Sequence, residues 1–290
     1  MSRILSSYVF ILIILFTISN ISTTQEGNLL NDLSSTVVYL LQEDVDIIRI
    51  NNEMYEIWLK VIDGKKPDST NIKPYIKPFS GTGFFIYNNK NDLYLVTAAH
   101  VAQNISNNSW VILKGPSDVP IKLKLVDIVG SKNISWVIHP TADIAVVKLR
   151  PSEKINNNYL QQRFLPLELC LKELVSPPRD VQLTIMGFPL GLGVDKNFSP
   201  LTLHTKASSG LVEMNRFDTG IKSTFFLCED PSLGGYSGAP CFDTSIYTIG
   251  SMTTTGGGMK IYGLIHGTIS QGGGLTAVVP IKYLFDILQK

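Results

Sequence analysis

A serine between two glycines has the setting best suited to nucleophilic chemistry in this chain. Ser237 lies in the run Gly235-Tyr236-Ser237-Gly238-Ala239-Pro240. Glycines permit a tight turn with unusual backbone angles, and such a turn can direct successive N–H groups at one point, where they stabilise an oxyanion. The loop alone is also compatible with an ordinary turn, so assigning a nucleophile requires a base and a carboxylate elsewhere in the chain.

A serine hydroxyl needs an adjacent base, because its own pKa is far too high for attack at neutral pH. The chain has four histidines. His100 ends a predicted strand after Thr97-Ala98-Ala99, where small residues leave room for a ring reached from a cleft. The base in turn needs a carboxylate that fixes its tautomer and stabilises the imidazolium. Asp143 fits, because it opens the apolar run 144–147, where an unpaired acid would be costly.

The elements that must position these residues are mainly short strands separated by Gly, Asn and Pro clusters, a pattern typical of β-sandwiches and barrels. Strands are predicted at 36–41, 83–87, 93–98, 110–114, 121–129, 144–149, 181–186, 201–206, 210–214, 223–228, 240–242, 261–266 and 276–279. A helix is predicted at Ile281–Gln289 from the helical spacing of its apolar residues, close to the end of the chain. The sequence therefore predicts an all-β fold with a C-terminal α-helix.

Three segments resemble the catalytic motifs of trypsin-like serine peptidases: Thr97-Ala98-Ala99-His100, Asp143-Ile144-Ala145 and the Ser237 loop. Their order along the chain, His then Asp then Ser, agrees with that family. The resemblance covers roughly Ser80 to Gln289. It includes Gly81-Thr82-Gly83, which is similar to the strand before the histidine in bacterial-type members. Residues 274–281 resemble the last strand and helix of HtrA-like and glutamyl-endopeptidase-like members.

This resemblance implies two antiparallel six-stranded β-barrels, the first at about 76–155 and the second at about 179–290, within a peptidase domain at 76–290. His100 and Asp143 would come from the first barrel and Ser237 from the second. The N–H groups of Gly235 and Ser237 would form the oxyanion hole. Ser237 would attack a peptide carbonyl to give an acyl-enzyme, with His100 carrying the proton.

Substrate preference is encoded more weakly. By the resemblance, Pro231, Ser232 and Leu233 would line part of the primary pocket, and the absence of an acid among them argues against a preference for Lys or Arg. His266 lies near the place where glutamate- and glutamine-specific relatives carry a pocket histidine. Its spacing from Gly263 differs by one residue, however, and one residue changes the face of a strand. A pocket role and a structural or exposed role both stay open.

Some residues near these motifs are expected to be structural. His139 and His204 are interpreted as structural or surface residues. Tyr236 occupies the place where animal digestive enzymes carry an Asp that pairs with a newly cut N-terminus, and a tyrosine cannot make that ion pair. We therefore expect Tyr236 to pack beneath the loop and expect no activation by that route.

Composition narrows the function classes. The chain has 290 residues, 44% of them apolar, which is enough for a sizeable core, and its net charge of +1 provides no basic excess for nucleic acid. No Cys/His spacing resembles a zinc site, so no metal or cofactor is expected. Three cysteines exclude a disulfide-dense scaffold. Two alternatives stay open: a disulfide between Cys228 and Cys241, or free buried thiols at all three cysteines, Cys170 included.

Residues 1–24 have the layout of a secretory signal peptide: Arg3, the apolar run Tyr8–Phe16, then small polar residues. The run is shorter than the roughly 20 residues that span a bilayer. We expect secretion or a periplasmic location, with cleavage within Ser19–Gln25. A retained membrane anchor is the alternative, and only that would bring membrane contact. Residues 25–75 would be an extension, a propeptide or the first barrel strand.

The sequence thus predicts an exported serine endopeptidase acting on protein or peptide substrates, with oligomeric state unspecified. The alternative is a catalytically silent binding module on the same fold. An α/β-hydrolase esterase does not fit, because its elbow needs glycine where Ala239 stands and its histidine follows the serine in the chain.

Overall fold

The computed structural model describes residues 30, 32–42, 79–244, 246–249, 252–255, 258–269 and 274–288. The expected signal segment at 1–24 and most of the extension at 25–75 lie outside these residues. No helix in the described ranges combines the length and the apolar character that a bilayer-spanning helix requires.

The first sheet has eight strands in the order β5-β4-β1-β2-β3-β7-β6, with β8 beside β2. These are β1 (Val37–Gln42), β2 (Phe79–Tyr87), β3 (Leu93–Thr97), β4 (Trp110–Lys114), β5 (Pro120–Lys124), β6 (Val137–Ile138), β7 (Ala145–Leu149) and β8 (Leu165–Pro166). Its pairings are antiparallel except that β8 runs parallel to β2. The strand that precedes His100, β3, therefore lies directly beside the strand that follows Asp143, β7.

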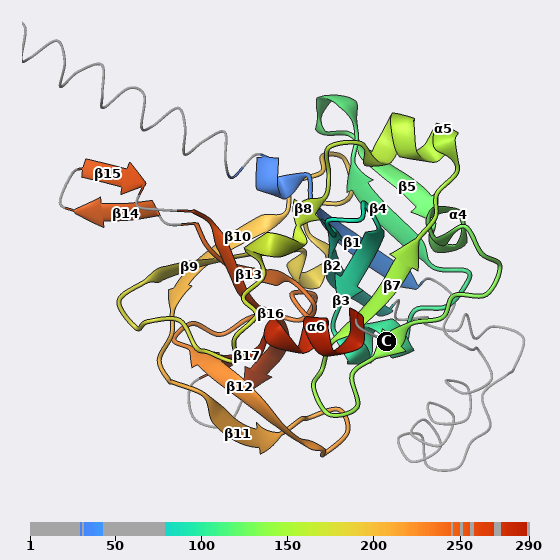
Figure 1. The fold of residues 1–290 in the computed structure, drawn as a ribbon. Helices are drawn as coiled ribbons and strands as arrows, with labels where there is room; N and C mark the ends of the chain where they lie inside the picture. Colours follow the sequence, from blue (N-terminus) through green and yellow to red (C-terminus); the bar gives the residue numbers. More distant parts are fainter. Residues whose placement is uncertain are drawn as a thin grey trace, which may run out of the picture.

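The second sheet has seven strands in the order β10-β9-β13-β16-β17-β12-β11. These are β9 (Gln182–Gly187), β10 (Leu201–Lys206), β11 (Val212–Asn215), β12 (Lys222–Cys228), β13 (Pro240–Asp243), β16 (Lys260–Ile269) and β17 (Leu275–Pro280). The hairpin β14 (Ile246–Ile249) with β15 (Met252–Thr255) is a separate pair that projects from the body of the molecule (Figure 1).

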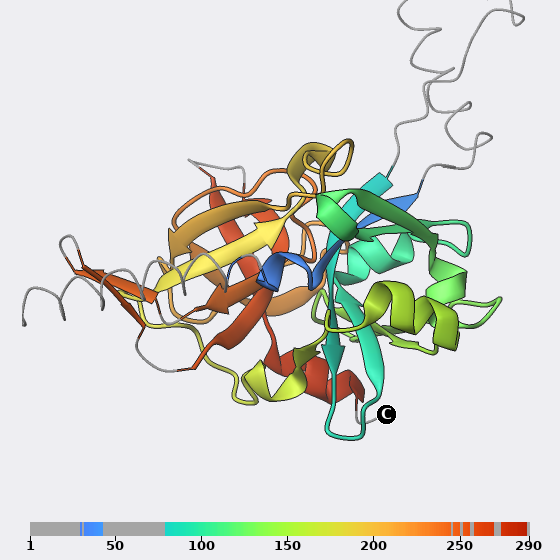
Figure 2. The ribbon, with the colours of Figure 1, turned by 90° about the horizontal axis from the view of Figure 1, so that it is seen from above.

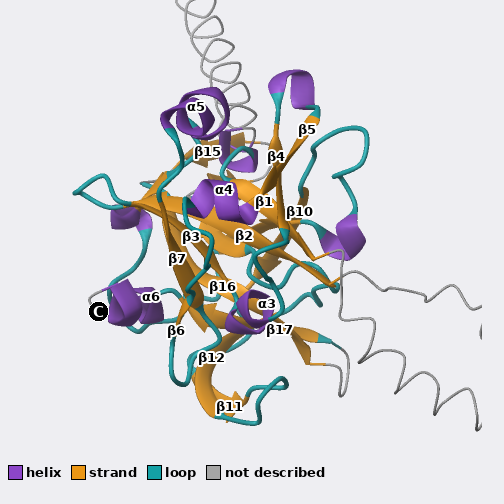
Figure 3. Cartoon of the chain, turned by 90° about the vertical axis from the view of Figure 1, so that its right-hand side faces the viewer, coloured by secondary structure: helices purple, strands orange, loops and turns teal. Residues whose placement is uncertain are grey.

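The helices are short and lie around the strands (Figure 3). They are α3 (Ala99–Gln103), α4 (Leu125–Val129), α5 (Glu153–Ile155) and α6 (Lys282–Leu288), with single turns at 116–118, 156–160, 167–169 and 189–191. α6 follows the last strand of the second sheet but contacts β7 of the first. Its Leu284 and Ile287 are buried there, and Tyr283 packs on His139 at 4.9 Å between ring centroids. α6 therefore ties the two sheets together.

A shared core joins the two sheets, which lie side by side in two perpendicular views (Figures 1 and 2). Phe84, Phe85 and Ile86 in β2 are all fully buried, so this strand is covered on both faces. Tyr39 of β1 meets Phe188, just after β9, at 5.7 Å between ring centroids. Burial of such aromatic side chains stabilises the contact between the two halves.

The observed elements refine the sequence-based predictions. The fold is mostly β with two antiparallel sheets, which hold eight and seven strands in the described residues, and the closure of these sheets into six-stranded barrels stays a prediction. The predicted strand 121–129 is wrong in its second half, because α4 occupies 125–129 and ends at Gly130 in the left-handed conformation (φ 68°). Apolar residues without clear alternation did not distinguish a short helix from a strand.

The three cysteines are free, buried thiols. Of the two alternatives that the sequence leaves open, the structure therefore has the unbridged one, with Cys228 at the end of β12 and Cys241 in β13. Burial raises the pKa of the Cys170 thiol far above its usual range, with a smaller contribution from nearby Glu168.

Candidate active site

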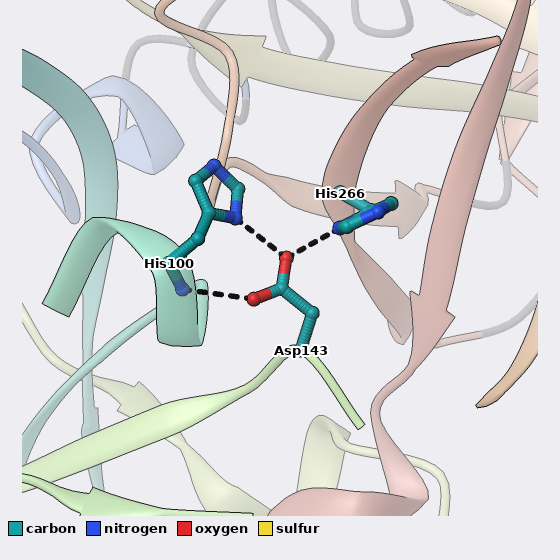
Figure 4. A group of neighbouring side chains, drawn as sticks. All are labelled: His100, Asp143 and His266. Carbon is teal, nitrogen blue, oxygen red and sulfur yellow. Dashed lines mark hydrogen bonds and ion pairs between the residues drawn. The ribbon is translucent and has the colours of Figure 1, made fainter. Parts of the chain in front are cut away.

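Three side chains from three different elements converge on one point (Figure 4). His100 lies in α3, Asp143 in the turn before β7, and His266 in β16. Nδ1 of His100 lies 2.7 Å from Oδ2 of Asp143, and Nδ1 of His266 lies 2.5 Å from the same oxygen. The first pair was expected from the sequence, and the second was not.

The backbone around His100 adds a further contact to Asp143. β3 ends at Thr97, Ala98 is extended (φ −69°, ψ 145°), and α3 begins at Ala99. His100 is therefore in the first turn of a short helix, not at the end of a strand as the sequence indicated. N–H groups in a first helical turn have no partner within the helix, and that of His100 donates to Asp143 Oδ1 at 2.9 Å. The carboxylate thus takes both the ring and the backbone N–H of one residue.

Asp143 is positioned by a turn that His139 stabilises. Nδ1 of His139 accepts N–H groups from Ala142 at 2.8 Å and Thr141 at 3.2 Å. This leaves Asp143 between buried Ala142 and Ile144, with its own side chain fully buried. The contacts of His139 are therefore those of a structural residue, whereas His204 is exposed on β10.

Arg216, which directly follows β11, is a buried cation that sequence reasoning did not identify. Its side chain is 3% exposed, and Nη2 lies 3.2 Å from Asp143 Oδ1. It also holds Asp218 through two bonds, Nε–Oδ1 at 2.9 Å and Nη2–Oδ2 at 2.6 Å. Nη1 donates to the carbonyl of Thr141 at 3.1 Å. A residue of the second sheet thus supports the turn that carries Asp143 in the first.

The ionisation of Asp143 follows from these donors. Burial acts to raise the pKa of Asp143, but hydrogen bonds from His100 and His266, together with their electrostatic attraction, outweigh it and hold the pKa well below its usual range. The carboxylate is therefore ionised at neutral pH, and both imidazoles donate their Nδ1 protons to it.

His266 is enclosed on every side. It is 1% exposed, Phe217 stacks on it at 4.0 Å between ring centroids, and Phe225 lies at 5.1 Å. Its Nε2 accepts the backbone N–H of Phe217 at 3.4 Å, and its Nδ1 is bound to Asp143. The pocket role that the sequence left open receives no support from this geometry, because neither ring nitrogen faces a cleft. The β-bulge between Ile265 and Gly267 lies at this residue.

The Ser237 loop needs its two glycines for steric reasons. Gly238 has φ 84°, and a Cβ there would lie 2.2 Å from the Thr82 carbonyl oxygen and 2.3 Å from Thr97 Oγ1. Gly235 has φ 103°, and a Cβ there would lie 2.4 Å from the carbonyl oxygen of Phe188. The loop is therefore pressed against β2 and against the end of the β3 strand that leads into His100.

Thr82 of β2 links the loop to the first sheet. Its hydroxyl donates to the Gly235 carbonyl at 2.7 Å, and its N–H donates to the Ser237 carbonyl at 2.8 Å. The Ser237 hydroxyl donates to the carbonyl of His266 at 3.2 Å. No hydrogen bond joins Ser237 to His100 in the described part of the chain. The structure thus brings His100 and Asp143 into contact and places Ser237 on the adjoining loop, with its hydroxyl turned to His266.

The backbone of this loop alternates between paired and unpaired N–H groups. The N–H of Tyr236 donates to the Leu233 carbonyl at 3.2 Å, whereas those of Gly235 and Ser237 have no backbone acceptor among the described residues. The Tyr236 side chain is buried in the second sheet's core, and its hydroxyl donates to the Leu201 carbonyl at 3.3 Å. It packs beneath the loop, as the sequence indicated.

The segment expected to line a primary pocket borders the loop. Pro231 and Leu233 are exposed, while Ser232 is buried. The Ser232 hydroxyl lies 3.0 Å from that of Thr268, which follows His266 in β16.

His100, Asp143 and His266 also provide the donor types that a metal ion takes, with one ligand atom each within 4.8 Å of one another. The hydrogen bonds described above already account for these atoms. The Arg216 guanidinium beside the carboxylate also opposes a second cation. The set is therefore better suited to a proton network than to a metal ion.

Two antiparallel sheets with a shared core, and a His–Asp pair beside a glycine-bounded serine, define a chymotrypsin-like peptidase fold. The sequence model of the trypsin-like peptidase domain matches residues 81–250, more than half of the chain. The chain therefore belongs to the trypsin-like peptidase domain family. This membership supports protease activity. No curated protein sequence matches the chain significantly.

Solved structures resemble the chain in fold. The active form of the Rv3671c protease from M. tuberculosis has a TM-score of 0.50 at 13% identity, covering 90% of this chain and 82% of that one. Deg5 has a TM-score of 0.49 at 14% identity, covering 91% and 92%. The MamO protease domain from Magnetospirillum magneticum has a TM-score of 0.49 at 12% identity, covering 89% and 98%. At these identities the likeness concerns the fold alone.

Proposed function

We propose that the chain is a serine endopeptidase that hydrolyses peptide bonds through Ser237, His100 and Asp143. One observation carries the proposal: buried Asp143 binds both the ring N–H of His100, at 2.7 Å, and its backbone N–H, at 2.9 Å. An ionised acceptor at Nδ1 fixes the tautomer in which Nε2 is the free base, which is the form a serine nucleophile needs. Family membership supports the same reaction class.

The steps follow from these groups. Rotation of the Ser237 hydroxyl away from the His266 carbonyl would bring its proton to Nε2 of His100. The oxygen attacks the peptide carbonyl as His100 takes the proton, and His100 then gives it to the leaving amine. Water repeats the sequence on the resulting acyl-enzyme, releasing the acid and restoring Ser237. Proton transfer of this kind contributes about 10²- to 10⁴-fold to rate.

The oxyanion formed in both steps needs donors. The N–H groups of Gly235 and Ser237 are proposed for that role, since both lack a backbone acceptor in the described chain while Tyr236 between them has one. Removing one such donor from comparable sites costs about 10²- to 10³-fold in kcat. Pro231, Ser232 and Leu233 are proposed to border the pocket for the residue before the cut, and protein or peptide segments are the proposed substrates.

The larger organisation is part of the proposal. We propose that the two sheets correspond to the two six-stranded barrels of this fold, and that the folded unit includes β1, which pairs with β2 and β4.

We also propose that residues 1–24 direct export to a secreted or periplasmic location. Amino-terminal sequencing of the exported protein tests this: a new terminus within Ser19–Gln25 supports cleavage, and an intact Met1 on a membrane-bound protein supports an anchor.

Labelling with a serine-directed fluorophosphonate tests the enzyme claim. We expect the folded wild-type protein to be labelled and Ser237→Ala not to be. Ser117→Ala is the matched control, because Ser117 is an exposed serine between β4 and β5 that has no part in the proposed site, and this variant should remain labelled. If the folded protein takes no label, the silent binding module becomes the better description. Digestion of a peptide library by the unlabelled wild-type protein then identifies the residue preferred before the cut.

A further inference from the structure

His266 is the second imidazole on the proposed catalytic carboxylate. Asp143 Oδ2 accepts Nδ1–H from His100 at 2.7 Å and from His266 at 2.5 Å (Figure 4). His266 comes from β16 of the second sheet, whereas Asp143 and His100 come from the first. The hydrogen bond from His266 is therefore a direct link between the two halves of the molecule at the site.

The contacts of His266 determine its protonation state. Nδ1 carries a proton, because it faces an ionised carboxylate at hydrogen-bond distance. Nε2 carries none, because it accepts the N–H of Phe217. These two contacts are the ones that a neutral imidazole with its proton on Nδ1 would make. A second proton at Nε2 would displace the Phe217 N–H and would add a second cation beside the Arg216 guanidinium on the same carboxylate.

This neutrality matters for the charge near His100. The charged groups of the network are Asp143, Asp218 and Arg216, and two carboxylates with one guanidinium leave one net negative charge. That charge is complementary to the imidazolium that forms on His100 during the proposed reaction. A neutral donor at His266 orients Asp143 without cancelling this charge, which a cation in its place would do.

We propose that His266 is a positioning residue: as a neutral Nδ1–H donor it fixes the Asp143 carboxylate, and through it the orientation of His100. It does not act as the base itself, because its ring is 1% exposed and both nitrogens are bound. The inference rests on the proposed function, since it assigns Asp143 and His100 their catalytic roles.

Two substitutions separate the donor from the ring. Asparagine can place an amide N–H near the position of Nδ1 but cannot titrate, and leucine fills similar space with no donor. We expect His266→Leu to lower both kcat and the fluorophosphonate labelling rate by about 10- to 100-fold, the range for one hydrogen bond to a charged group, with KM within about twofold. His266→Asn should recover to within about fivefold of wild type. His204→Leu, on an exposed histidine, is the control and should match wild type.

The outcomes separate this inference from the function on which it rests. If the wild type is labelled and His266→Leu is labelled equally fast, the positioning role is wrong while the peptidase assignment stands. If His266→Asn is as slow as His266→Leu although both are folded, donation by residue 266 is not what the site requires, and the inference fails. Absence of labelling in the folded wild type would overturn both.

Nuclear magnetic resonance of the wild-type protein covers the case in which the variants do not fold. We expect Nδ1 of His266 to be protonated and its Nε2 unprotonated throughout the pH range of activity. The Nδ1 proton should resonate at low field, because it is shared with a carboxylate. A protonated Nε2 on His266 at the pH of maximal activity would overturn the proposal, because the ring would then be a cation and not a neutral donor.

Discussion

Replacing Arg216 with methionine tests how the buried network around Asp143 is held together. The guanidinium is 3% exposed and donates to Asp143, to Asp218 and to the Thr141 carbonyl, with distances from 2.6 to 3.2 Å. Methionine keeps a side chain of similar length but has no donor and no charge. Arg216→Met therefore leaves two carboxylates close together in a site that is largely closed to water.

The magnitude follows from the burial of this ion pair. Removing one partner of a buried pair costs about 3–5 kcal/mol, because the remaining charge is left uncompensated. For a domain of roughly this size, each 1 kcal/mol lowers Tm by about 2–4 °C. We therefore expect Arg216→Met to lower the free energy of unfolding by about 3–5 kcal/mol and Tm by about 6–20 °C.

Urea unfolding at neutral pH measures the change in the free energy of unfolding, and calorimetry measures the change in Tm. The matched control is Lys222→Met, which removes the cation of an exposed pair with Glu213, at 65% and 63% exposure, and should leave stability nearly unchanged. Adding Asp218→Asn to Arg216→Met should restore part of the loss, because it removes one of the two unpaired carboxylates. With Asp218→Asn measured alone as well, the double-mutant cycle yields the coupling between residues 216 and 218.

Two results would refute this reasoning. A free energy of unfolding for Arg216→Met within about 1 kcal/mol of wild type would show that the carboxylates relax to water or take up protons at little cost. A double variant less stable than Arg216→Met alone would show that Asp218 contributes something other than charge compensation for Arg216.

Three further outcomes follow from contacts described above. Asp143→Asn should destabilise the protein at neutral pH. Because the pKa of Asp143 is lowered in the folded state, the stability that its carboxylate contributes is present above the unfolded pKa of about 3.9 and is lost as pH falls further. The difference in unfolding free energy between wild type and variant, measured by urea titration, should therefore shrink below about pH 4, and a difference that grows with acid would contradict this sign. Gly238→Ala should abolish fluorophosphonate labelling and lower Tm, because its Cβ would overlap Thr82 and Thr97; normal labelling would show that the loop can move away from the first sheet. The Cys170 thiol, whose pKa burial raises, should react with a disulfide reagent only after denaturant is added, and rapid reaction of the folded protein would show that its site opens.

Local sequence patterns predicted several strands well. The strands at 110–114 and 201–206 have the predicted bounds, and β7 begins one residue after the predicted start at Ile144. These segments are rich in β-branched and aromatic residues and are bounded by turn formers, so local preference and tertiary packing agree. α3 was missed because its five residues are too short for a helical period to emerge, and a single turn depends on tertiary contacts for its stability.

The contact between His100 and Asp143 was also predictable, because each lies next to a recognisable strand. The rest of the network was not. Arg216 and Asp218 lie in the connection between β11 and β12, which reads as an ordinary exposed turn, and only the packing of one sheet on the other buries the Arg216 side chain. For His266 the sequence left open a role in the substrate pocket or a structural or exposed role. The β-bulge at this residue sets the direction of its ring, and the residue types give no clear signal of the bulge.

The position of β1 has a consequence for the covalent integrity of the molecule. β1 is hydrogen-bonded along both edges, to β2 on one side and β4 on the other, although residues 43–78 separate it from β2 in the chain. Its side chains at Val37, Val38 and Leu40 are fully buried. After a single peptide-bond cut between residues 43 and 78, β1 would therefore stay bound as an interior strand of the first sheet, and the product would be a two-chain protein.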